Sequence, residues 1–183
     1  TLTLSVEQAE LARARAEAAG VSDRITIDVR DYRDAVGEYD AVVSIEMIEA
    51  VGERFWPEYF RTVDRLLAPG GRFGLQSITM PHHRLRATKA SYTWIHKYVF
   101  PGGLIPSLEA IDDTLARHTT LAVVDRRSIG PDYAETLRRW RQTFLSRAPE
   151  VRALGFDETF VRMWDFYLAY AEAGFATGYL DDW

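Results

Sequence analysis

Apolar and polar positions alternate between helix-like and strand-like stretches in the first part of the chain. Ser5-Val6-Glu7-Gln8 has the capping-box pattern of a helix start, and the alanine-rich stretch after it ends at Gly20, a residue that suits a helix stop. Residues 24–29 alternate as a strand does. Residues 39–45 form a continuous apolar run, which is typical of a strand buried on both faces of a parallel sheet.

The same alternation continues to about residue 78. Helical spacing of apolar residues over 53–67 predicts a helix, which Pro69-Gly70-Gly71 ends, and residues 72–78 predict a strand. Residues 1–4 are short, apolar and β-prone. The resulting order of strand, helix, strand, strand, helix, strand favours an α/β fold, with the crossover between the middle strands in 31–38.

The second part of the chain has a different texture. Residues 121–126 form a candidate strand, whereas Asp132–Leu145 and Phe156–Phe175 have the pattern of amphipathic, aromatic-rich helices. Their aromatic side chains are expected mainly in the core, with part of the set available to line an apolar tunnel. No internal repeat or clear linker interrupts the chain, so we predict a single domain.

Composition narrows the class of protein. The 183 residues, of which 47% are hydrophobic and 27% charged, suit one globular domain, and the net charge of −5 argues against a nucleic-acid binder. There is no cysteine, and the four histidines lack zinc-ligand spacing, so no metal site is expected. We expect a cytoplasmic protein. The chain begins at Thr1 rather than Met and ends at Asp182-Trp183 as if a strand were starting, so we also expect a fragment.

Three segments together resemble one family. They are Thr3-Leu4-Ser5 with Gln8, residues 40–52 with Glu49, and residues 98–107. Their order and spacing resemble the cyclopropane-fatty-acyl-phospholipid synthases and the mycolic acid cyclopropane synthases. The likeness extends over essentially the whole chain.

The resemblance implies a class I S-adenosylmethionine (SAM)-dependent methyltransferase fold. This is a Rossmann-like α/β fold with a mostly parallel sheet and helices on both faces, and this chain would lack its first strand and glycine-rich loop. Residues 1–183 would then be the C-terminal major part of one such domain. Residues 81–118 and 131–176 would be its helical segments on the acceptor, or lipid, side.

The activity that the resemblance implies is transfer of a one-carbon group from SAM to the double bond of an unsaturated phospholipid acyl chain. The product would carry a cyclopropane or a methylene or methyl branch. Two other interpretations stay open: a SAM-dependent methyltransferase for a small soluble acceptor, and a non-catalytic paralogue. The same fold supports all three.

Two short segments are the expected cofactor site. The resemblance places Thr3, Leu4, Ser5 and Gln8 at the carboxyl end of the second family strand, where open α/β sheets bind ligands. It places Asp31 and Tyr32 beside the adenine, which an Asp carboxylate and an aromatic ring can bind. A strand end with a helix cap and a solvated turn are the plainer interpretations of these segments.

Four residues are the expected catalytic group. The resemblance implies that Glu49, Gln76, Tyr133 and the Ile78 backbone hold a bicarbonate ion that acts as the base. Gln76 departs from the family, which often has a histidine there, but its amide can still bind an oxyanion. On local pattern alone, Glu49 is a first-turn helix glutamate and Tyr133 lies on a helix face.

Two neighbouring positions refine this picture. Ala50 is a second departure, because a histidine often follows the family glutamate. Glu46 has no counterpart in the family and is interpreted as a structural or cofactor-proximal acid. These changes bear on the exact product more than on the overall chemistry.

The segment 82–97 is basic and contains no acidic residue. With its interleaved aromatic residues it could contact an anionic membrane surface on the inner face of the membrane, whereas a solvated helix face is the alternative interpretation. A homodimer is a further expectation that the sequence leaves open.

Overall fold

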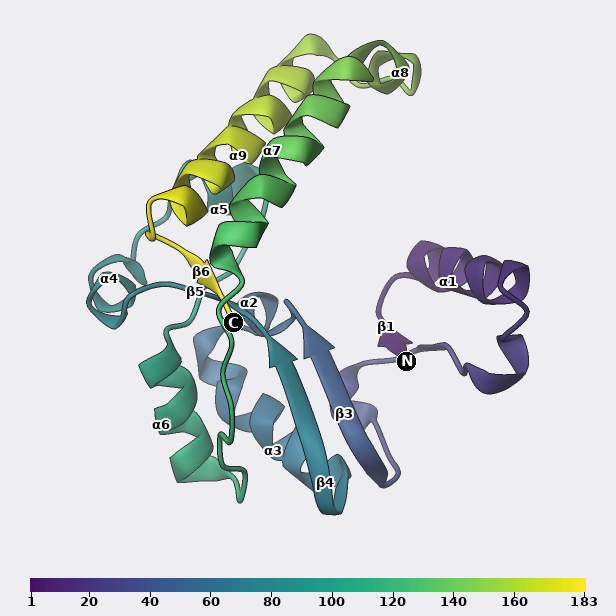
Figure 1. Ribbon diagram of the computed structural model, residues 1–183, viewed down its shortest axis with the longest axis vertical. Coiled ribbons are helices and arrows are strands. Elements are labelled where there is room, and N and C mark those ends of the chain that lie inside the picture. The colour runs from purple at the N-terminus through teal and green to yellow at the C-terminus, as the bar shows by residue number, and fades with distance from the viewer.

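Three pairs of strands organise the chain in the computed structural model, which describes residues 1–183 (Figure 1). β1 pairs with β2 and β3 with β4, both in parallel, and β5 pairs with β6 in antiparallel fashion. The strands are β1 (Leu2–Thr3), β2 (Asp28–Val29), β3 (Tyr39–Ile45), β4 (Leu67–Gln76), β5 (Ile78–Thr79) and β6 (Asp181–Asp182).

Nine α-helices and three 3₁₀ turns connect and cover these strands. The helices are α1 (Val6–Ala18), α2 (Ile48–Val51), α3 (Trp56–Leu66), α4 (His82–Thr88), α5 (Trp94–Tyr98), α6 (Leu108–His118), α7 (Gly130–Ser146), α8 (Ala148–Ala153) and α9 (Glu158–Ala176). The turns are η1 (Ser22–Arg24), η2 (Tyr32–Asp34) and η3 (Glu53–Phe55).

The predicted start of α1 is confirmed. The Ser5 hydroxyl accepts a hydrogen bond from the Gln8 backbone N–H at 3.1 Å, which satisfies one of the free donors of the first helical turn. Gly20 follows the helix with φ of 66°, a conformation that glycine adopts without strain. The strand predicted over residues 24–29 is shorter than expected, because η1 takes its first residue and only Asp28–Val29 pairs with β1.

The β3–β4 pair carries the first hydrophobic core. Helices α2, α3 and α6 bury Ile48, Phe60 and Ile111 against it. The prediction that residues 39–45 are buried on both faces is wrong for this chain, since Val43 and Ile45 are 69% and 63% exposed. These two side chains point away from α3, and no element of the chain covers that face.

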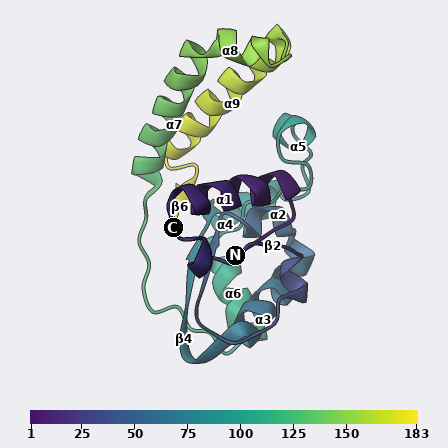
Figure 2. The same ribbon diagram turned by 90° about the vertical axis from the view of Figure 1, so that its right-hand side faces the viewer.

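The second core lies between α7 and α9, which were both predicted. Leu137 of α7 and Leu168 and Phe175 of α9 are its buried centre. Figures 1 and 2 show the two helices side by side, extending away from β3 and β4, with α8 at the far end. The C-terminus returns to the base of this hairpin, where β6 pairs with β5.

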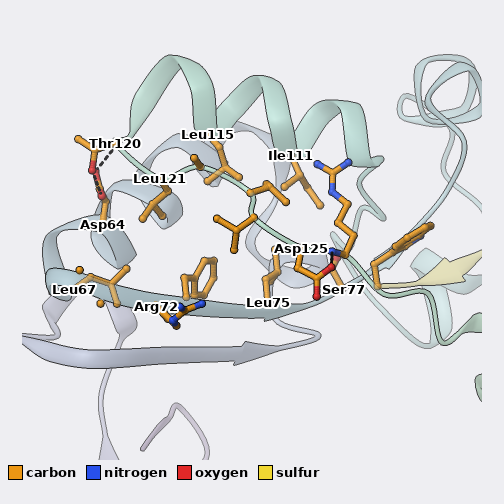
Figure 3. A pocket seen from close by; sticks show the side chains of 18 of the residues that line it. Asp64, Leu67, Arg72, Leu75, Ser77, Ile111, Leu115, Thr120, Leu121 and Asp125 are labelled. Atoms are coloured by element: carbon orange, nitrogen blue, oxygen red, sulfur yellow. Dashed lines mark hydrogen bonds between the residues drawn. The ribbon is translucent and has the colours of Figure 1, made fainter.

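The strand predicted over 121–126 is wrong. This segment pairs with no strand and instead lines a cavity of about 700 Å³ between β4 and α6. In Figure 3, Ile111, Leu115 and Leu121 lie across this cavity from Leu75 of β4. The segment has apolar spacing, but its backbone forms no ladder with the free edge of β4.

The second core gives a stability prediction. Leu137→Ala should lower the free energy of unfolding by about 2–5 kcal/mol, because Leu137 is 1% exposed and its loss leaves a cavity. The matched control Leu154→Ala removes a side chain that is 78% exposed and should change stability by less than about 0.5 kcal/mol. Urea unfolding measures both, and equal losses in the two variants would contradict the assigned core.

Candidate active site

The candidate site forms where β3 and β4 end at the same edge. Ile45 at the end of β3 is paired with Gln76 at the end of β4, and the Glu46 N–H donates to the Gln76 carbonyl at 2.9 Å. Carboxyl ends of parallel strands are where open α/β sheets bind ligands. The side chains of Glu46 and Gln76 therefore enter the site as neighbours.

Glu49 is anchored by the turn between β4 and β5. Its Oε1 atom accepts hydrogen bonds from the Ser77 hydroxyl at 2.9 Å and from the Ile78 backbone N–H at 2.6 Å. Burial raises the pKa of Glu49, and these hydrogen bonds only partly offset that effect. The other carboxylate oxygen, Oε2, is buried without a partner. The structure thus brings the predicted residues Glu49 and Ile78 into direct contact.

Gln76 links two carboxylates that lie on either side of it. Its side-chain amide donates to Asp182 Oδ2 at 2.7 Å and to Glu46 Oε1 at 3.3 Å. Asp182 is fully buried, its Oδ1 has no partner, and burial raises the pKa of its carboxyl group. A polar group buried in this way is costly, which points to a functional or positioning role.

Tyr133 comes to the site from the first turn of α7. Its ring packs against Phe175 of α9 with centroids 4.6 Å apart. Burial, and next a hydrogen bond to the neighbouring Glu46 carboxylate, raise the pKa of Tyr133, so its hydroxyl stays protonated. Tyr167 of α9 is also half-buried beside Glu46, and its pKa is raised by burial and by that negative charge. One tyrosine of α7 and one of α9 therefore lie near Glu46.

All four predicted catalytic residues, Glu49, Gln76, Ile78 and Tyr133, lie around this one site, although their catalytic roles stay predictions. Sequence interpretation missed Asp182 and undervalued Glu46. The contact between Gln76 and Asp182 joins residues 106 positions apart, which no local pattern signals. Glu46 had a usable signal, because it directly follows an apolar strand at the sheet edge where ligands bind.

A bicarbonate ion does not fit the arrangement of donors in the structure. The Ile78 N–H is bound to Glu49 and the Gln76 amide to Asp182 and Glu46, while the Tyr133 hydroxyl lies beside the Glu46 carboxylate. Three carboxyl groups surround the place where the anion was expected, and like charges disfavour one another. The site as it stands therefore supports no reaction step through a bound bicarbonate.

The predicted cofactor residues gather at the carboxyl end of β1. The Thr3 hydroxyl donates to the Gln8 side chain at 2.9 Å and accepts from the Ser5 N–H at 3.1 Å, while Leu4 is 75% exposed. The Arg30 N–H donates to the Thr3 carbonyl at 3.0 Å, which brings the segment before Asp31 to this edge.

Asp31 and Tyr32 are held in fixed positions. Asp31 caps η2 and binds the Arg33 guanidinium at 2.6 Å, which lowers the pKa of Asp31 to about 2 and keeps it an ionised acceptor. Tyr32 packs edge-on to Tyr59 at 5.7 Å, and the Tyr59 hydroxyl donates to Ser44 of β3 at 2.7 Å. An ionised acceptor beside an aromatic ring fits an adenine with its exocyclic amine.

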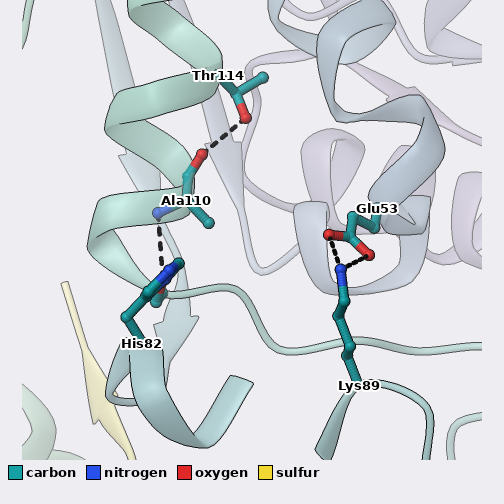
Figure 4. Close-up of polar contacts among 6 residues, drawn as sticks. Glu53, His82, Lys89, Ala110 and Thr114 are labelled. Atoms are coloured by element: carbon teal, nitrogen blue, oxygen red, sulfur yellow. Dashed lines mark hydrogen bonds and ion pairs between the residues drawn. The ribbon is translucent and has the colours of Figure 1, made fainter. Parts of the chain in front are cut away.

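The basic segment 82–97 is partly tied down. His82 Nδ1 lies 2.7 Å from the Ser107 hydroxyl, and Lys89 forms an ion pair with Glu53 at 2.8 Å (Figure 4). Trp94 of α5 packs on Phe166 of α9 with centroids 4.8 Å apart. None of the helices combines the length and apolar character that crossing a bilayer requires, and no group of three or more histidine or acidic side chains is arranged to hold a metal ion.

Comparison with known proteins places this geometry in a family. The sequence profile of the family described as "Mycolic acid cyclopropane synthetase" matches residues 1–183. The chain is 58% identical over 181 residues to "Tuberculostearic acid methyltransferase UfaA1" of Mycobacterium tuberculosis, which covers 99% of this chain and 42% of the relative. It is 37% identical over 167 residues to "Cyclopropane-fatty-acyl-phospholipid synthase" of Escherichia coli, covering 91% and 41%. The chain thus spans about two fifths of these relatives.

Solved structures confirm the fold. Mycolic acid cyclopropane synthase CmaA1 complexed with SAH and CTAB superposes with a TM-score of 0.85 at 24% identity, over 99% of this chain and 66% of that chain. Cyclopropane synthase MmaA2 from Mycobacterium tuberculosis gives a TM-score of 0.81 at the same identity and coverage. The predicted class I SAM-dependent methyltransferase fold is correct.

Glu49 gives a prediction about stability and pH. Because burial raises its pKa, the folded chain holds a proton on Glu49 more tightly than the unfolded chain does. The contribution of Glu49 to the free energy of unfolding is fully present below the pKa that Glu49 has in the unfolded chain. It is lost as the pH rises through the pKa that Glu49 has in the folded chain. The stability of Glu49→Gln relative to the unsubstituted chain should therefore increase as the pH rises above 4.5, the ordinary pKa of a glutamate.

Urea unfolding across this pH range measures the difference. Leu154→Ala removes no ionisable group and serves as the control, with a difference that should not vary with pH. A Glu49→Gln difference that stays constant or falls with rising pH would contradict the buried state of this carboxyl group.

Proposed function

The chain belongs to the mycolic acid cyclopropane synthetase family, and on this premise we propose that it is the C-terminal major part of a SAM-dependent domain that alkylates lipid double bonds. The proposed acceptor is an unsaturated phospholipid acyl chain, and the product carries a cyclopropane or a methylene branch. A methyl branch would require a further reductant. The observation that carries the proposal is the convergence of Glu49, Gln76, Tyr133 and Glu46 at the carboxyl ends of β3 and β4.

Each group in the site has a proposed task. SAM, when bound, supplies a methyl group on a positively charged sulfur, which an isolated alkene can attack. Thr3 and Gln8 offer a hydroxyl and an amide to the cofactor at the end of β1, with Leu4 and Ser5 in the same segment. Asp31 and Tyr32 would bind the adenine, as their ionised and half-buried states allow.

The aromatic side chains on the acceptor side would protect a carbocation. Tyr133 packs on Phe175, and Phe100 meets Tyr167 edge-on with centroids 5.8 Å apart. Aromatic faces attract cations, and an apolar wall keeps out the water that would trap the cation as an alcohol. Residues 81–118 and 131–176, which contain α4–α6 and α7–α9, are the proposed acceptor side.

The proposal predicts a lipid product and a sensitive residue. The full-length protein should add the mass of one methylene group to mono-unsaturated phospholipid chains in vesicles, measured by mass spectrometry. Glu49→Gln should lower turnover by about 100-fold or more, because Glu49 holds the Ser77–Ile78 turn of the site, and should leave SAM affinity within a few-fold. The exposed Glu38→Gln is the matched control and should keep full activity.

Three outcomes distinguish the proposed lipid activity from its alternatives. Consumption of SAM only with a soluble acceptor would support a small-molecule methyltransferase instead. No SAM binding by titration calorimetry would support a non-catalytic paralogue. Full turnover in Glu49→Gln would remove Glu49 from the mechanism while leaving the lipid activity in place.

A peripheral contact with an anionic membrane surface is proposed through residues 82–97. Arg86, Lys97 and Tyr92 are exposed there, and the Lys97 ammonium lies 4.8 Å from the ring centroid of the exposed Tyr98. Basic side chains near aromatic ones suit an anionic headgroup layer. An inner-membrane-face location and a homodimer remain predictions.

The contact predicts salt-sensitive binding to anionic vesicles. The double variant Arg86→Glu with Lys97→Glu should weaken vesicle binding by about 30-fold or more, since each basic residue near such a surface contributes about 1 kcal/mol and each introduced glutamate adds repulsion. Arg24→Glu reverses an exposed charge in η1 and is the control. Equal binding of the double variant and the control in a sedimentation assay would refute this surface.

A further inference from the structure

The donors that the family resemblance assigned to bicarbonate all lie beside carboxylates of this chain. Glu46 shares the Gln76 amide, at 3.3 Å, with Asp182, and it neighbours the Tyr133 hydroxyl. Glu49 takes the Ile78 N–H. A planar carboxylate and a bicarbonate ion present the same pair of acceptor oxygens, so a side-chain carboxylate satisfies the same donors.

We infer that the Glu46 carboxylate stands in the place of a bicarbonate ion and is the general base that removes a proton from the alkylated acyl chain. This inference rests on the proposed function. It assigns to the protein itself a role that the resemblance gave to a bound ion.

Glu46 is the carboxylate in position for this role. Glu49 already accepts two hydrogen bonds through Oε1 from the Ser77–Ile78 turn, and its Oε2 is enclosed. Asp182 is fully buried in β6 behind Gln76. Glu46 is only partly buried and lies beside Tyr133 of α7 and Tyr167 of α9, the two helices of the proposed acceptor side.

The backbone of Glu46 supports the same assignment. Glu46 has φ of 49°, the one non-glycine residue of the chain in the left-handed region. The left-handed conformation is sterically unfavourable for a residue with a long side chain such as glutamate. Non-glycine residues keep it where the surrounding structure holds them, often at functional sites. Here the Glu46 N–H continues the β3–β4 ladder onto the Gln76 carbonyl at 2.9 Å, which holds the backbone in this conformation.

Gln76 and Asp182 are positioning residues in this account. Asp182 Oδ2 accepts one N–H of the Gln76 amide at 2.7 Å, which orients the amide toward Glu46 Oε1. The amide then holds the Glu46 carboxylate, and the Tyr133 hydroxyl is its neighbour. This arrangement also explains why a glutamine serves where a histidine is common, since an amide holds a carboxylate without titrating.

The proposed step balances in atoms and charge. The alkene π electrons form a bond to the methyl carbon as its bond to sulfur breaks, which leaves a neutral thioether and a carbocation on the acyl chain. Glu46 accepts a proton from the new methyl group. The electrons of that C–H bond close a cyclopropane with the cationic carbon two bonds away. After a 1,2-hydride shift has moved the cation next to the methyl group, the same electrons form a methylene double bond. The Glu46 carboxylic acid then returns the proton to water.

The test compares bicarbonate dependence with loss of Glu46 in the full-length protein. Turnover on mono-unsaturated phospholipid vesicles is measured by mass spectrometry in carbon-dioxide-depleted buffer, with and without added sodium bicarbonate. The unsubstituted enzyme should keep its turnover within about twofold in both buffers. Glu46→Gln should lose about 100-fold or more in turnover, with SAM affinity within a few-fold by calorimetry, whereas the control Glu38→Gln should match the unsubstituted enzyme.

A second variant tests the position of the carboxylate. Glu46→Gly relieves the left-handed backbone and frees the Gln76 and Tyr133 donors, so added bicarbonate should raise its turnover at least about tenfold. Glu46→Gln keeps the space filled and should show no such rescue.

Two groups of results would separate the inference from the proposed function. Any of three results would overturn the role of Glu46 while the lipid product still forms. They are loss of turnover by the unsubstituted enzyme in carbon-dioxide-depleted buffer, near-normal turnover of Glu46→Gln, and failure of bicarbonate to rescue Glu46→Gly. Absence of that product from the unsubstituted enzyme in either buffer would instead overturn the proposed function.

Discussion

The parallel pairing of β3 with β4 is the constraint on which the site depends. Its register sets Ile45 opposite Gln76, so the residues that follow the two strands emerge at one edge. The packing of α2 and α3 on one face of this pair, through Ile48 and Phe60, fixes where α2 begins and aims Glu49 at the β4–β5 turn. A one-residue shift in this pairing would separate Glu46 from the Gln76 amide.

The chain completes the site from residues far along the sequence. After α9, the chain returns as β6 and pairs with β5, which buries Asp182 beside Gln76. The Ile129 N–H donates to the Asp182 carbonyl at 2.8 Å, so the same return anchors the start of α7 and positions Tyr133. The α7–α9 hairpin is therefore both a second core and the second wall of the site, and changes in its packing should reach the chemistry.

Patterns with local causes were the ones that sequence predicted well. The Ser5 cap and the amphipathic spacing of α7 and α9 depend on residues within a few positions. The α/β class was predicted from the order of strands and helices up to about residue 78, and the methyltransferase fold from the family resemblance. Two predictions were wrong: burial of residues 39–45 on both faces and a strand over 121–126. Both features require partners from other parts of the chain, which a local pattern does not reveal. Asp182 gave no signal for the same reason, and Glu46 was undervalued because its left-handed backbone is set by the ladder, not by its own side chain.

The central claim is that a carboxylate of the chain occupies the position expected for a separate anion. A crystal structure of the full-length protein, grown with bicarbonate and refined at atomic resolution, tests it most directly. The account predicts the Glu46 carboxylate within about 2.6–3.2 Å of both the Gln76 amide nitrogen and the Tyr133 hydroxyl, with no further anion between them. A planar anion bound to those two donors, with the Glu46 side chain turned away, would contradict it.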